Sequence, residues 1–122
     1  MNDTRLGLVE ARFADIVWQH QPLSTKELVL LCEQELNWKR TTTYTVLKKL
    51  CERGIFATES SMVSARLSRE EFYAIQSERF VEETFDGSLP AFIAAFASRK
   101  KPSDKELEEI RRMMASFGEE QP

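Results

Sequence analysis

The stretch from Trp38 to Arg53 constrains the fold most, because its residues sort by chemistry when they are placed on a helix. At about 100° per residue, one side carries the positions suited to packing: Thr43, Val46, Leu47 and Leu50. The opposite side is polar: Thr41, Thr42, Thr45, Lys48, Lys49 and Glu52. The stretch holds five basic residues and one acidic residue, a local charge of +4. It predicts a helix over residues 40–53 that packs one face on a core and exposes a cationic face.

Short hydroxyl side chains crowd the first turns of this exposed face. β-Branched threonines are mediocre helix formers, and a helix exposed for solubility alone would more often carry Glu, Lys or Gln there. Entry into the major groove of DNA gives the threonines a use, since short side chains permit close approach to base edges and thymine methyl groups. A solvated amphipathic helix without a binding role is the alternative.

Two helices are expected before this stretch. Residues 8–20 have apolar side chains at helical spacing, and Pro22 ends that helix. Ser24 and Glu27 have the spacing of a capping box, which opens a second helix that continues to Leu36. The second and third helices therefore form a helix-turn-helix unit, in which the third is the recognition helix.

A hairpin is expected after the third helix. Gly54 occupies the position of a left-handed C-terminal cap. Residues 55–59 and 62–67 then alternate like two short strands around Ser60-Ser61. Three helices followed by a hairpin make a winged helix, in which the hairpin is the wing.

The rest of the chain predicts three more helices. Capping pairs with the spacing Ser-x-x-Glu open the first at Ser68 and the last at Ser103, and residues 89–96 carry one apolar stripe between them. The fold class is therefore mainly α with a small β-hairpin. We expect a winged helix-turn-helix DNA-binding domain over residues 1–67 and a helical dimerisation domain over residues 68–122.

The dimer is predicted from the aromatic content of the second domain. Six of the eight phenylalanines lie in residues 68–122, on short helices that together are too small for a full core. A second copy of the chain would bury them, although folding back on the winged helix would also cover them. The expected dimerisation residues are apolar: Phe72, Ile75, Phe80, Phe85, Leu89, Phe92, Ile93, Phe96, Leu107, Ile110 and Met114.

The chain of 122 residues has a formal charge of −3, which by itself argues against a nucleic-acid partner. The charge is unevenly distributed, however. Residues 1–67 hold nine basic and eight acidic side chains, whereas residues 68–122 hold eight and twelve. The acidity belongs to the predicted dimerisation domain, so the average charge does not describe the segment expected to meet DNA.

Neither catalytic nor metal chemistry is predicted. The chain has one histidine, His20, and its two cysteines, Cys32 and Cys51, fall in helical apolar patterns typical of reduced thiols. No glycine-rich phosphate loop or nucleophile–base pair is present. We expect no enzyme activity, no catalytic residue, no metal and no cofactor. With neither a signal peptide nor an apolar run of spanning length, we expect a cytoplasmic protein that does not insert directly into membranes.

Double-stranded DNA is the expected partner, and its contacts divide by chemistry. We assign base edges to Thr42 and Thr45 with Thr41 beside them. Phosphates or guanines are assigned to four basic residues: Lys39, Arg40, Lys48 and Lys49. Arg66 in the wing is assigned to the backbone or the minor groove. A winged helix that serves only as a protein-interaction module is the alternative from another class.

The chain resembles the penicillinase-repressor family over nearly its whole length, from Leu6 to Phe117. The first part of the resemblance is Leu6, Glu10 and the Ile16-Val17-Trp18 end of the first helix. Four further segments of this chain resemble the family's remaining motifs: Leu23–Leu28, Trp38–Leu50, Ser68–Tyr73 and Phe85–Leu89. The order and spacing of these segments make the resemblance specific.

This resemblance implies a cytoplasmic homodimeric repressor that binds a dyad-symmetric operator. In founding members, a membrane sensor-protease responds to β-lactam and leads to cleavage at an Asn-Phe bond. The matching positions are Ala95-Phe96, which keep the Phe and lack the Asn, so release by a ligand without proteolysis is an alternative. The wing lacks the family's usual aromatics, and the cysteine cluster of the copper-responsive branch is absent.

Overall fold

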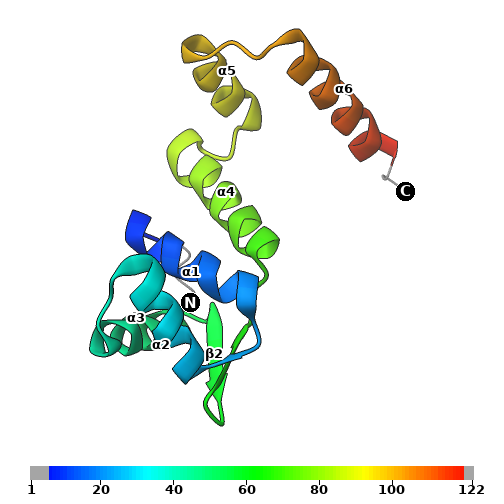
Figure 1. Cartoon of the computed structure of the whole chain (residues 1–122). Coiled ribbons are helices and arrows are strands. Elements are labelled where there is room, and N and C mark those ends of the chain that lie inside the picture. The colour runs from blue at the N-terminus through cyan, green and yellow to red at the C-terminus, as the bar shows by residue number, and fades with distance from the viewer. Residues whose placement is uncertain (1–5, 120–122) are drawn as a thin grey trace. The chain divides into compact units, whose positions relative to one another are not determined.

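The computed structural model describes residues 6–119, which form six helices and three short strands (Figure 1). In chain order these are α1 (Leu8–His20), β1 (Leu23–Ser24), α2 (Thr25–Leu36), α3 (Arg40–Glu52), β2 (Phe56–Glu59), β3 (Met62–Ala65), α4 (Arg69–Phe85), α5 (Leu89–Arg99) and α6 (Asp104–Glu119). The predicted fold class is confirmed: a winged helix-turn-helix is followed by helices.

Reciprocal capping boxes start α2, α4 and α6, as the sequence predicts. The Ser24 hydroxyl accepts the Glu27 N–H at 3.0 Å, and the Glu27 carboxylate accepts the Ser24 N–H at 3.1 Å. The same pair of bonds recurs at Ser68 and at Ser103, each with the glutamate three residues later. These bonds satisfy N–H groups that have no partner within the helix, so each of the three helices begins where its own sequence specifies.

The sheet has one strand more than the predicted hairpin. Its order is β1-β3-β2, with antiparallel pairing throughout. The turn between β2 and β3 is Ser60-Ser61, with φ of 50° and 61°, the left-handed geometry that tight hairpin turns require. The carbonyl of Ser61 accepts the Thr25 N–H at 2.9 Å. The tip of the wing is thereby joined to the first turn of α2.

Aromatic side chains dominate the core of the winged helix. Phe13, Phe56 and Phe72 are completely buried. The Trp18 ring lies against two of them, 5.6 Å from Phe56 and 5.5 Å from Phe72 between ring centroids. Its indole N–H donates to the Leu67 carbonyl at 3.0 Å. One side chain of α1 thus holds the end of the wing and the beginning of α4.

The chain forms two compact units, and their division falls inside α4 between Arg79 and Phe80. The sequence placed the domain boundary earlier, after residue 67. One predicted dimerisation residue, Phe72, consequently lies in the first unit, where its side chain is completely buried. Phe72 contacts Trp18 and Tyr73 within the same unit, so its side chain belongs to the core of the winged helix.

Replacing Phe72 by Ala should destabilise the first unit by about 3–5 kcal/mol, the usual cost of a large cavity in a closed core. Urea unfolding followed by tryptophan fluorescence measures this directly, because Trp18 and Trp38 both belong to this unit. Phe80→Ala is the control, since half of the Phe80 side chain is exposed. Equal effects of the two substitutions would contradict the assignment of Phe72 to this core.

Candidate nucleic-acid interface

The two predicted faces of α3 are present. Thr43, Leu47 and Leu50 are buried, and Val46 is partly buried against the same core. The residues expected to meet DNA are all exposed: Lys39, Arg40, Thr41, Thr42, Thr45, Lys48 and Lys49. The core therefore fixes which side of α3 is presented to the surroundings.

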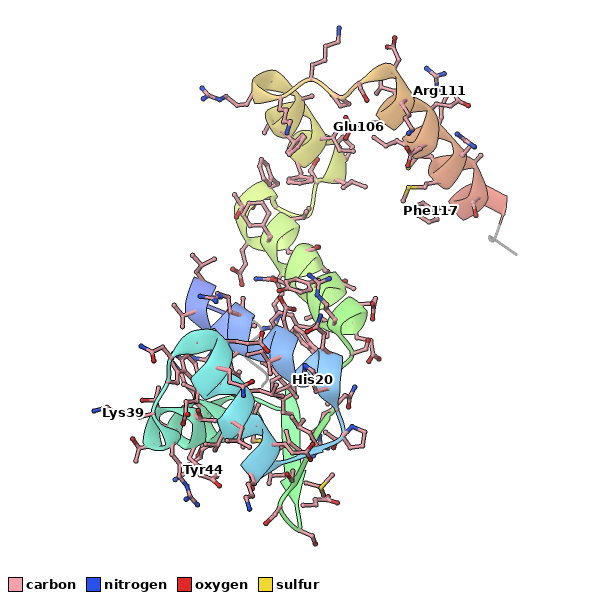
Figure 2. All side chains as sticks on the ribbon, viewed as in Figure 1. His20, Lys39, Tyr44, Glu106, Arg111 and Phe117 are labelled. Atoms are coloured by element: carbon pink, nitrogen blue, oxygen red, sulfur yellow. The ribbon has the colours of Figure 1, made fainter. Side chains whose placement is uncertain are left out.

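The first turn of α3 lacks the usual stabilising groups. Its N-cap is Lys39, whose side chain makes no capping bond, and no acidic residue lies in the first turn. Lys39 and Arg40 instead place positive charge at the positive end of the helix dipole, which is typically unfavourable by about 0.3–1 kcal/mol per charge. Figure 2 shows Lys39 pointing outward from the unit. An anion at this end of α3 would relieve both deficits.

The threonine hydroxyls of the exposed face differ in their bonding. Thr45 donates to the Thr41 carbonyl at 2.9 Å, which leaves its lone pairs as acceptors. Within the described residues the hydroxyls of Thr41 and Thr42 form no hydrogen bond to the protein. These two side chains are therefore able to donate and to accept without breaking an existing bond.

One flank of α3 is held to α1 by charge. Glu10 accepts from the Lys49 ammonium at 2.8 Å and lies 3.7 Å from the Arg53 guanidinium. The hydrogen bond from Lys49, together with one from the Gly7 N–H, lowers the pKa of Glu10. Lys49 was predicted to contact phosphate, but it already has a carboxylate partner, whereas no ion pair involves Lys48 among the described residues. The sequence offered no signal that these two neighbouring lysines differ.

The other flank of α3 carries Tyr44, which sequence analysis assigned to neither face. The Arg40 guanidinium lies over its ring, 5.6 Å from the centroid, and a hydrogen bond from the Thr25 side chain lowers its pKa. About a third of Tyr44 is exposed. The signal that could have found it was its position on the helical wheel, at the edge of the polar face next to Thr41 and Lys48.

Arg66 lies at the opposite end of the hairpin from the turn. It follows β3 directly, and its N–H donates to the Ile55 carbonyl at 2.9 Å. The side chain is exposed, but it belongs to the base of the wing and not to its Ser60-Ser61 tip. The residues predicted on α3 therefore lie on one exposed face. Arg66 lies at the base of the hairpin, and the length of β3 separates it from the tip of the wing.

The second unit leaves most of its apolar surface uncovered. None of its described side chains is fully buried, and nine large apolar residues are between 38% and 55% exposed: Phe80, Leu89, Ile93, Phe96, Leu107, Ile110, Met113, Met114 and Phe117. Two of these nine, Met113 and Phe117, are not among the dimerisation residues predicted from the sequence. Exposed apolar surface of this extent is typical of an interaction site.

Some of the predicted dimerisation residues contact one another within the second unit. Phe92 lies within 6.0 Å of Phe80 and of Phe85 between ring centroids, in edge-to-face geometry. Phe85 and Phe92 are half-buried as a result, and Ile75 is half-buried in the first unit. Ala95 and Phe96 lie in the middle of α5, and both are exposed.

Groups of acidic, cysteine or histidine side chains suited to a metal ion do not occur in residues 6–119. Cys32 is buried, and this burial raises the pKa of its thiol. Over the same range of residues, no helix has the length and apolar character needed to cross a membrane.

The described residues form a helix-turn-helix followed by a hairpin, and α3 exposes a cationic face, an arrangement typical of DNA-binding regulatory proteins. Residues 6–116 match the penicillinase repressor family, and the chain belongs to that family. It is similar to the penicillinase repressor of Bacillus licheniformis, with 17% identity over 109 residues that cover 86% of this chain and 85% of the relative. The family is described as one of repressors, which is a regulatory class of protein.

Replacing Glu10 by Gln should lower the free energy of unfolding by about 0.5–1 kcal/mol at neutral pH. The folded pKa of Glu10 is lowered below its ordinary value of 4.5, so the carboxylate stabilises the fold above that pH and loses this effect as the pH falls through the folded pKa. Urea unfolding at several pH values should show the two proteins converging in acid. Glu33→Gln is the control, because Glu33 is exposed on α2. A difference between Glu10→Gln and the unmodified chain that persists unchanged in acid would contradict the role given to the carboxylate.

Proposed function

We propose that the protein is a homodimeric transcriptional repressor that binds a dyad-symmetric operator through α3 of each copy. The observation that carries this proposal is the exposed face of α3, where hydroxyl and cationic side chains stand on a helix whose other face is buried in the core. Two such helices would meet half-sites about one turn of DNA apart, or a multiple of it.

The contacts divide by the chemistry of the side chains. Thr41, Thr42 and Thr45 contact base edges, since they are short and stand on the first turns of α3. Lys39, Arg40 and Lys48 neutralise phosphates and supply the salt-dependent part of the affinity. Lys49 contributes less, because Glu10 holds its ammonium. Arg66 contacts the backbone beside the base of the wing.

Dimerisation is supported by the uncovered apolar surface of the second unit. Helices with no fully buried side chain gain little from folding alone, and association with a second copy would remove nine half-exposed apolar side chains from water. A two-fold axis brings the same surface of each copy together. A dimer that carries two α3 helices then binds DNA more tightly than a single copy.

Release from the operator follows from proteolysis within the second unit. A peptide bond inside a helix must unwind before a protease can bind it in extended form, so cleavage at Ala95-Phe96 requires local opening of α5. Cutting there separates part of the apolar surface from α6 and favours monomers. The resemblance of the motifs supports a β-lactam or cell-envelope signal that is relayed by a membrane sensor-protease.

Replacing Lys48 by Gln should weaken binding to random duplex DNA by about three- to tenfold and reduce the slope of log K against log salt by about 0.9. Lys49→Gln should have a smaller effect on both quantities. The two lysines are adjacent and carry the same charge, but only the ammonium of Lys49 is held by a carboxylate, at 2.8 Å. Fluorescence anisotropy at several salt concentrations measures affinity and slope together.

Two further variants complete this experiment. Lys105→Gln on α6 removes the same charge outside the proposed interface and should bind like the unmodified chain. Thr42→Ala should alter the preference between DNA sequences, at about 1–3 kcal/mol for a good base contact. Absence of any salt-dependent binding by the unmodified chain would refute the proposed function and favour a protein-interaction module.

Replacing Ile110 by Glu should shift the protein from dimer to monomer, because it places a charge in the apolar stripe of α6. Ala115→Glu is the matched control, since residue 115 lies about 140° away from 110 on the helix. Sedimentation velocity distinguishes the two states. A chain that ends at Ala95 should also be monomeric, and an unchanged dimer in that chain would contradict release by cleavage.

A further inference from the structure

A groove on the first unit lies beside the exposed face of α3. Three segments border it: the beginning of α2, the first turns of α3 and the turn of the wing. Its volume is about 680 Å³. One hydrogen bond joins two of these walls, since the Thr25 N–H donates to the Ser61 carbonyl at 2.9 Å.

The side chains that line this groove suit an extended anion. Lys26 and Arg40 supply two positive charges, and no acidic side chain is part of the lining. The Thr25 side chain lowers the pKa of Tyr44, and the phenolic O–H of Tyr44 is a hydrogen-bond donor. Figure 2 shows Tyr44 at the surface of the unit. Val29 and Leu30 form an apolar wall beside these groups, and Leu30 is half exposed.

A phosphodiester strand presents both kinds of surface, because charged phosphates alternate with sugars that have apolar faces. The position of the groove also fits such a strand. The groove is bordered by the first turns of α3, which the proposed function places in the major groove of DNA, so the backbone of one strand would run beside it. In this protein the space between α3 and the wing turn is the groove lined by Lys26, Arg40 and Tyr44.

We propose that this groove binds the sugar–phosphate backbone of one operator strand, with Lys26 and Arg40 on successive phosphates and the Tyr44 hydroxyl donating to one of them. The proposal rests on the proposed function, since it requires α3 to enter DNA. It adds Lys26 and Tyr44 to the interface and gives Tyr44 a second role: its ring holds the Arg40 guanidinium at 5.6 Å and so limits the positions that this cation takes.

The test compares Lys26→Gln and Tyr44→Phe in the full chain, with a random-sequence DNA duplex as the probe. Lys26→Gln should weaken binding about three- to tenfold and reduce the salt slope by about 0.9. Tyr44→Phe keeps the ring and the Arg40 stack but loses the hydroxyl, so it should weaken binding about threefold with little change in slope, as expected for loss of an uncharged contact.

Three controls make the outcomes distinct. Lys105→Gln tests loss of charge elsewhere, Tyr73→Phe tests loss of a hydroxyl outside the groove, and thermal unfolding verifies that each variant is folded. If Lys26→Gln and Tyr44→Phe bind like the unmodified chain while Lys48→Gln is weakened, the groove does not hold the backbone although α3 binds DNA. If the unmodified chain does not bind duplex DNA, the proposed function fails, and this proposal fails with it.

Discussion

The contacts of Trp18 join α1 to the hairpin and to α4, and the candidate interface depends on this arrangement of the first unit. Its ring packs against Phe56 of the hairpin and Phe72 of α4, and its N–H bonds the carbonyl of Leu67 where the hairpin ends. The wing can be placed beside α3 only if the far end of the hairpin is fixed, and this side chain fixes it. The buried side chains of Thr43, Leu47 and Leu50 then orient α3. Because these side chains pack in the core, the basic side chains on the opposite face of the helix are exposed.

Local patterns predicted most of the fold, because the information for helix starts and faces lies within a few residues. The three capping boxes and the two faces of α3 are of this kind. The strand β1 was missed because two residues carry no periodicity, and it exists only through its pairing with β3. The burial of Phe72 was missed for a related reason, since apolar spacing identifies a face but not the unit that covers it.

The candidate site was predictable in its residue types and less so in its electrostatics. Every α3 residue assigned to DNA from the sequence is exposed. The partner of Lys49, however, is Glu10, which lies 39 positions earlier in the chain, and only the folded structure brings the two together. Tyr44 was not predicted for a local reason. It lies at the border between the two faces of α3, and an aromatic side chain is suited to either face. Long-range contacts thus decide which cations of a basic helix are free.

The uncapped first turn of α3 links the stability of this helix to DNA binding. α3 begins at Arg40 after the N-cap Lys39, and no side chain caps it, so the amide groups of its first turn have no capping partner among residues 6–119. A phosphate of the operator would accept from those amides and would offset the repulsion between the two cations and the helix dipole. The recognition helix would then be completed by its own ligand, and its first turn would exchange amide hydrogens more slowly on DNA than in the free protein.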